Sequence, residues 1–127
     1  MGMKETVAGN AKLRRKNELT AIIDKLHGRT VIYKDAIMKI HAGRYATFDN
    51  LVLTLFDPEE GPFSNITVNI EPLPVDEFAV DINNFPGALQ ILTYNNIAHP
   101  TEKVLRSGFC IYPVWKLNEE VLKEYDQ

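Results

Sequence analysis

Apolar side chains recur with the period of an α-helix near the N-terminal end of the chain. Between residues 19 and 26, aliphatic side chains are spaced by three and four residues, so they line one face of a helix. Asn17 is a candidate N-cap, and Asn10 is an alternative that would lengthen the helix by about two turns. Gly28 suits the left-handed position that often ends a helix. The pattern predicts one N-terminal helix and leaves its start open.

The period of the apolar positions changes to two after this helix, as expected of side chains that alternate across a β-strand. Residues 57–62 contain two prolines and a glycine, so we expect them to form a loop. Residues 51–56 and 66–70 would then pair across this loop as an antiparallel hairpin. The predicted strands are residues 30–33, 36–41, 51–56, 66–70, 78–82 and 109–115.

Two shorter helices are predicted further along the chain. Asn84 lies where the N-cap of a mid-chain helix would be, and apolar residues up to Leu92 share one helical face. Asn118 can cap a short C-terminal helix, and residues 99–101 are predicted to form a loop. Together the elements predict an α+β fold. It consists of an antiparallel sheet, a meander of about five to six strands, with an N-terminal, a mid-chain and a short C-terminal helix packed on it.

Length and composition indicate one globular domain. The chain has 127 residues, of which 45% are hydrophobic and 24% are charged. Residues 1–10 are small and polar and are predicted to form a flexible N-terminal tail, with residues 11–127 as a single α+β domain. The sequence has no apolar run long enough for a membrane span and no signal-peptide core, and its single cysteine excludes an internal disulfide framework. We therefore expect a reducing cytoplasm and no membrane partner.

Positive and negative charges are divided unequally along the chain. Residues 1–44 carry a net charge of +6, and residues 45–127 carry −9. No Lys or Arg occurs in residues 45–102, so cations for this acidic stretch must come from the N-terminal part, from the last quarter of the chain or from another molecule. Its carboxylates are Asp49, Asp57, Glu59, Glu60, Glu71, Asp76, Glu77, Asp81 and Glu102.

Several short motifs run through the second half of the chain. They include Leu53-Thr54-Leu55-Phe56-Asp57, Thr67-Val68-Asn69, Glu71-Pro72-Leu73, Ser107-Gly108-Phe109 and Pro113-Val114. This order resembles a small bacterial family of unknown function, whose members are often carried on conjugative plasmids and other mobile elements. The resemblance covers roughly residues 36–117. It implies a bacterial cytoplasm and an accessory role, and it brings no catalytic residue.

Candidate catalytic and metal-binding residues are few. His27, His41 and His99 share no metal-ligand spacing. Cys110 lies in a predicted strand without a basic or helix-terminal neighbour that would activate its thiol, so we expect a buried structural cysteine. No glycine-rich nucleotide motif occurs. We therefore predict no metal, no cofactor and no catalytic residue, with a small enzyme of unrecognised pocket as an alternative.

A basic run at residues 12–16 is the one feature that points toward nucleic acid. It has no interleaved aromatic side chain, and the acidic remainder of the chain would repel a polyanion. We therefore expect no direct nucleic-acid binding and interpret the run as the solvated start of a helix. Its cations are Lys12, Arg14, Arg15 and Lys16.

The acidic stretch favours a protein-interaction function. We predict a non-enzymatic module of a bacterial mobile element that binds a basic partner, for example a nucleic-acid-binding protein, through an acidic face. One alternative is neutralisation of these acids by the basic N-terminal part. Another is a structural homo-oligomer, such as a homodimer, formed through a strand edge near Thr30 or Pro113. The predicted partner-binding residues are Asp57, Glu59, Glu60, Asp76, Glu77 and Asp81.

Overall fold

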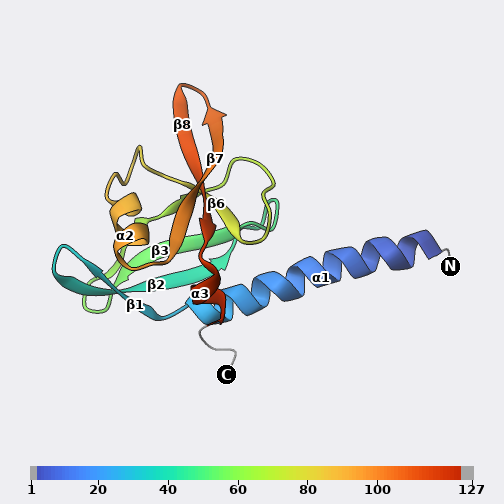
Figure 1. Ribbon diagram of the computed structural model, residues 1–127, viewed down its shortest axis with the longest axis horizontal. Coiled ribbons are helices and arrows are strands. Elements are labelled where there is room, and N and C mark those ends of the chain that lie inside the picture. The colour runs from blue at the N-terminus through green and yellow to red at the C-terminus, as the bar shows by residue number, and fades with distance from the viewer. Residues whose placement is uncertain (1–2, 124–127) are drawn as a thin grey trace.

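The computed structural model describes residues 3–123, with side chains described from residue 9 onward. Over this range the chain forms three helices and two antiparallel sheets of four strands each, which confirms the predicted α+β class. The strands are more numerous than the predicted five to six, and they form two sheets rather than one meander. Figure 1 shows the β7–β8 hairpin running across the strands of the other sheet.

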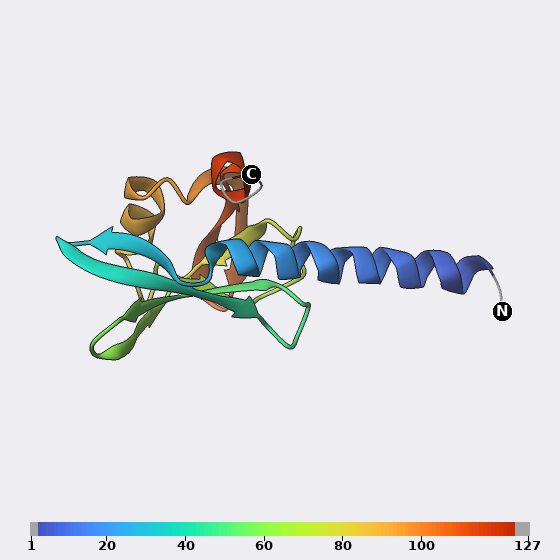
Figure 2. The ribbon, with the colours of Figure 1, turned by 90° about the horizontal axis from the view of Figure 1, so that it is seen from below.

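Helix α1 (Met3–Leu26) begins before either predicted N-cap. The predicted apolar face is confirmed near its C-terminal end, where Leu19, Ile22 and Leu26 are buried. Toward its N-terminus the helix extends away from the body of the molecule (Figures 1 and 2). Residues 3–10, which were predicted to belong to a flexible tail, have helical backbone, and their flexibility stays a prediction.

The first sheet has the strand order β1-β2-β3-β4, with neighbouring strands antiparallel. Lys34 and Asp35 join β1 to β2 with φ of 49° and 67°, the left-handed pair typical of a tight hairpin turn. In β3, alternate residues are buried, as the period of two predicts. The strands are β1 (Arg29–Tyr33), β2 (Ala36–Arg44), β3 (Leu51–Asp57) and β4 (Gly61–Asn65).

The predicted hairpin between residues 51–56 and 66–70 is wrong. β4 pairs with β3 instead, and its Pro62 is tolerated because β4 is an edge strand. Beyond β4 the chain leaves the first sheet: Ile66 N donates to Leu53 O, and Leu53 N donates to Thr67 Oγ1. Thr67 and Val68 then pair with Val80 and Ala79 in the second sheet.

The second sheet has the strand order β5-β6-β8-β7. The predicted loop at residues 99–101 is wrong, because these residues lie within β7. The register of β7 against β8 shifts between Pro100 and Val104, and such a bulge accommodates a proline that cannot donate a hydrogen bond. The strands are β5 (Thr67–Val68), β6 (Glu77–Val80), β7 (Ala98–Ser107) and β8 (Cys110–Leu117).

Helix α2 (Ala88–Tyr94) begins later than predicted, with Gly87 as its N-cap in place of Asn84. Asn84 donates from its backbone N and its Nδ2 to the carboxylate of Asp81, at 3.4 and 3.0 Å, and so holds a turn before the helix. A Cβ at Gly87 would lie 2.6 Å from Oη of Tyr33, so any larger residue where the helix starts would displace the Tyr33 ring. The short C-terminal helix is α3 (Glu119–Lys123), as expected after Asn118.

The main core lies between the two sheets and the buried faces of the three helices. It includes Leu19 of α1, Leu53 of β3, Phe78 of β6 and Ile91 of α2. A smaller apolar cluster, formed by Leu73, Ala79, Leu105 and Val114, lies under the β7–β8 hairpin. None of the helices within residues 3–123 has the length and apolar composition that crossing a membrane requires.

Candidate functional site

The acidic stretch supplies the candidate site, and its predicted residues occupy different environments. Glu77 and Asp81 are buried, with 8% and 7% of their surface exposed, and Asp76 is half-buried. Glu59 and Glu60 are exposed in the turn between β3 and β4. The six predicted residues therefore divide into a group along β6 and a group at the β3–β4 turn.

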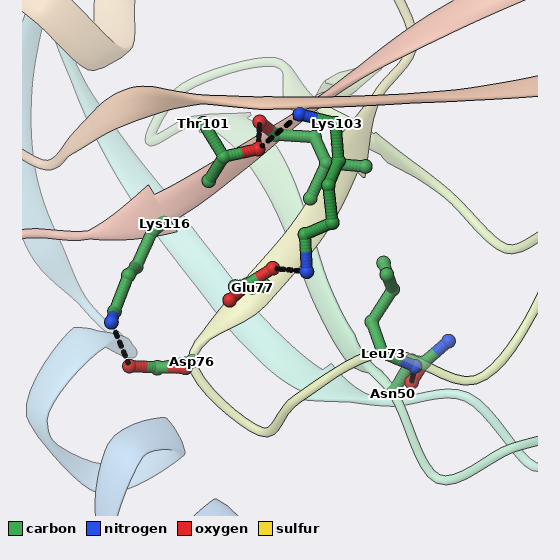
Figure 3. Close-up of polar contacts among 8 residues, drawn as sticks. Asn50, Leu73, Asp76, Glu77, Thr101, Lys103 and Lys116 are labelled. Atoms are coloured by element: carbon green, nitrogen blue, oxygen red, sulfur yellow. Dashed lines mark hydrogen bonds and ion pairs between the residues drawn. The ribbon is translucent and has the colours of Figure 1, made fainter.

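The carboxylates at the start of β6 are paired with cations from the last quarter of the chain. Glu77 forms an ion pair with Lys103, and Asp76 lies 3.8 Å from Lys116 Nζ (Figure 3). The β7–β8 bulge positions Lys103, whose backbone N donates to Thr101 Oγ1. The last quarter of the chain, which was one of the predicted sources of cations, thus supplies partners for Asp76 and Glu77.

Asp81 has a structural role at the end of β6. Both of its carboxylate oxygens accept hydrogen bonds from Asn84 Nδ2, and this contact fixes the turn that leads into α2. The Asp81 charge also contributes to the environment of Tyr45. The pKa of the Tyr45 phenol is raised, chiefly by burial and further by Asp81, while its hydrogen bond with Thr67 acts in the opposite direction.

Three carboxylates of the β3–β4 turn remain without a cation. Asp57 Oδ1 accepts hydrogen bonds from the backbone N of Glu59 and Glu60 at 2.9 and 3.4 Å, which stabilises the turn. Within the described residues, no ion pair reaches Asp57, Glu59 or Glu60. We call these three residues the acidic turn.

Among the described ion pairs, only one joins a cation of the basic N-terminal part to a carboxylate of the acidic stretch. Arg44 lies 3.5 Å from Asp49, and its Nη2 donates to Thr20 Oγ1 of α1 at 2.6 Å. Arg15, the half-buried member of the basic run, donates to the backbone O of Asp49 at 3.1 Å. The N-terminal helix therefore binds the β2–β3 loop and does not reach the acidic turn.

Asn50 is a structural residue that directly precedes β3. It is 4% exposed, and its Nδ2 donates to Asn69 Oδ1 and to Glu71 O at 2.9 and 2.8 Å. Its Oδ1 accepts from Leu73 N and from Arg15. Asn50 therefore joins α1, the β2–β3 loop and the segment before β6. This role has no signal in the sequence, where Asn50 is only a polar residue next to a strand.

Two of the three histidines, His27 and His41, lie next to each other, with ring centroids 4.6 Å apart. His41 stacks on Phe56 with ring centroids 3.9 Å apart, and its pKa is lowered, first by burial and then by the nearby His27. His99 and Cys110 lie toward opposite ends of the β7–β8 hairpin, and Cys110, predicted to be buried, is half-buried. Among residues 9–123, no three His, Cys, Asp or Glu side chains gather as a metal site.

Comparison with known proteins gives a family and no function. Neither a search of curated proteins nor a search of solved structures gave a match. Residues 39–127 match the family model described as "Domain of unknown function (DUF4313)". The match begins in β2, so α1 and β1 lie outside it. At its C-terminal end it extends past residue 117, where the resemblance in the sequence ends. The chain thus belongs to the DUF4313 family, a family of unknown function.

Proposed function

We propose that this chain is a non-enzymatic protein-interaction module, and that it docks a basic protein partner on the acidic turn. One observation carries the proposal: once the ion pairs of the described residues are assigned, the predicted site retains exposed, uncompensated carboxylates only at this turn. Charges in such a turn attract a basic partner over about one Debye length, ~10 Å at 0.1 M salt. The family resemblance supports a bacterial cytoplasm and a mobile element as the setting.

The turn is suited to docking because its backbone is held in place. β4 pairs with β3 up to Asp57 and Gly61, and the Asp57 carboxylate bonds to the backbone of the turn itself. A partner therefore meets Glu59 and Glu60 on a fixed support, which lowers the entropy lost on binding. The proposed docking site leaves out Asp76, Glu77 and Asp81, which were predicted to lie on the same face. Their contacts stabilise the fold around β6 instead.

The experiment compares charge reversals at two sites in the acidic stretch. A decalysine peptide serves as the probe, and its affinity is measured by titration at low and moderate salt. We expect Glu59→Lys with Glu60→Lys to weaken binding about tenfold, which corresponds to about 1.4 kcal/mol. The matched control reverses Glu71 and Glu102, which are exposed and without ion pairs in the described structure, and changes the net charge equally. An equal loss in both variants would show that the turn has no special role.

The homo-oligomer alternative has weaker support at one of its two predicted edges. β1 is an edge strand, as the prediction near Thr30 requires. However, Asn95 Oδ1 accepts from Ile32 N, and Asn95 Nδ2 donates to Ile32 O, at 2.9 and 3.0 Å. A second copy that added a strand here would have to displace this side chain, so Asn95 protects the edge. Near Pro113, β8 is paired with β7 on one side, and its ladder with β6 ends at Val114.

A further inference from the structure

A groove of about 410 Å³ lies between α1 and the loop that joins β2 to β3. The α1 side consists of Lys12, Arg15 and Lys16, which share a helical face because they are three and four residues apart. The loop side consists of Ala46, Phe48 and Asp49. We call this groove, lined by these six residues, the basic groove.

Phe48 is displayed in this groove by an unusual backbone conformation. Its φ is 68°, in the left-handed region that bulky residues rarely adopt, and 42% of its surface is exposed. The loop is held on both sides of it, because Arg15 donates to Asp49 O and Tyr45 N donates to Asn50 O at 2.9 Å. A strained backbone that presents an aromatic ring to solvent is typical of a binding position.

The groove also contains two uncompensated cations. Lys12 and Lys16 are exposed, and within the described residues no hydrogen bond or ion pair reaches either of them. Arg15 is engaged with the loop, and the Asp49 charge is offset by Arg44 at 3.5 Å. The groove therefore presents two ammonium groups beside an exposed aromatic ring.

We propose that the basic groove binds single-stranded nucleic acid, with phosphates at Lys12 and Lys16 and an unpaired base stacked on Phe48. Positive grooves with aromatic stacking platforms are the common chemistry of single-strand binding. The bases of a duplex are already stacked on one another, so a duplex leaves Phe48 without a partner. This groove is independent of the acidic turn, which lies at the opposite end of the molecule from the free end of α1 (Figure 2).

The sequence argued against nucleic acid because the acidic remainder of the chain would repel a polyanion and because the basic run contains no aromatic residue. The structure changes the second argument, since the β2–β3 loop brings Phe48 next to the run from a distant part of the chain. In the folded chain an aromatic side chain therefore lies beside the cations of the basic run, although none lies between them in the sequence.

The test uses the full chain and a fluorescently labelled oligothymidylate of about twenty nucleotides, long enough for one site. Its affinity is measured by anisotropy at several salt concentrations. We expect Lys12→Gln with Lys16→Gln to weaken binding roughly tenfold or more and to reduce the slope of log K against log salt by about 1.4, since each phosphate contact contributes about 0.7. Phe48→Leu should weaken binding at least about fivefold with the slope unchanged, because stacking involves no counterion release.

A matched control and two competing ligands make the proposal falsifiable. Lys34→Gln with Arg106→Gln removes the same charge from exposed positions outside the groove and should change the affinity little. An equal loss in this control, or no measurable binding of oligothymidylate even at low salt, would overturn the proposal. A polyglutamate peptide that binds as tightly would indicate an acidic peptide site, and a duplex that binds more tightly and independently of Phe48 would indicate phosphate contacts alone. Phe48→Leu must unfold at the same temperature as the unsubstituted protein, so that its loss of binding reports the missing aromatic ring. Phe48→Tyr, which keeps an aromatic face, should retain binding.

Discussion

His27, His41 and Phe56 show how single residues connect the end of α1 to the first sheet. His27 follows α1, and its Nδ1 accepts a hydrogen bond from Ala42 N of β2 at 3.1 Å. Its ring lies against His41, with centroids 4.6 Å apart, and His41 stacks in turn on Phe56 of β3. The contacts place the His41 ring where a positive charge is less well solvated and lies near His27. Protonation of His41 should therefore oppose folding.

We expect His41 to make the protein less stable as the pH falls. Its folded pKa lies below the ordinary value of 6.5, so the unfolded chain binds a proton at higher pH than the folded chain does. The stabilising contribution is fully present above pH 6.5 and is lost as the pH falls toward the lowered folded pKa. Urea unfolding of the protein and of His41→Phe, which keeps the aromatic stack, should show a smaller loss of stability in the variant between about pH 7 and pH 5.5. An identical loss in both proteins would mean that His41 is not responsible.

Strand β3 shows how an element's sequence pattern translates into packing. Leu51, Leu53 and Leu55 are buried and face the main core, while the residues between them are half-buried on the other face. Alternation over these few residues is enough to assign the faces, because a strand turns successive side chains to opposite sides. The same reasoning does not hold for β5, a strand of two residues in which Thr67 is buried and Val68 is half-buried under the smaller cluster.

Leu53→Ala should therefore destabilise the protein strongly, and Val68→Ala should do so less. Leu53 is fully buried, and removing its side chain leaves a cavity in the main core, which costs about 2–5 kcal/mol. Val68 is only half-buried, so we expect a loss of about 1 kcal/mol. The measurement is the free energy of unfolding from urea denaturation of both variants. A loss at Val68 as large as that at Leu53 would place Val68 in a more tightly packed position than the structure shows.

The whole molecule separates charge along its length. Helix α1, which carries Lys12 and Lys16, extends toward one end, the β3–β4 turn lies at the other, and β6, where Asp76 and Glu77 form their ion pairs, lies between them (Figures 1 and 2). Exposed charges contribute little to stability, whereas an ion pair with a buried partner is costly to break. The charges that support the fold and those that are available to partners are thus different residues.

Charge reversals should separate these two sets. Glu59→Lys with Glu60→Lys should leave the midpoint of thermal unfolding nearly unchanged, because no cation in the described structure is paired with either residue. Glu77→Lys should lower the stability by roughly 2 kcal/mol, since it brings a second ammonium group to the buried position beside Lys103, which is itself half exposed. Thermal unfolding followed by circular dichroism measures both effects. A marked destabilisation by the turn reversal would favour the alternative in which internal neutralisation accounts for the acidic stretch.

The sequence alone determined the features that depend on neighbours a few residues apart. The apolar face of α1, the alternation of β3, the break between the strands on either side of residues 34–35 and the overall α+β class follow from local spacing. The tertiary structure alone decided which strand pairs with β3, which carboxylates receive the cations of Lys103 and Lys116, and where Phe48 lies relative to α1. These contacts join residues far apart in the chain, and their geometry follows from packing two sheets and three helices around shared cores. Local periodicity carries no information about that packing.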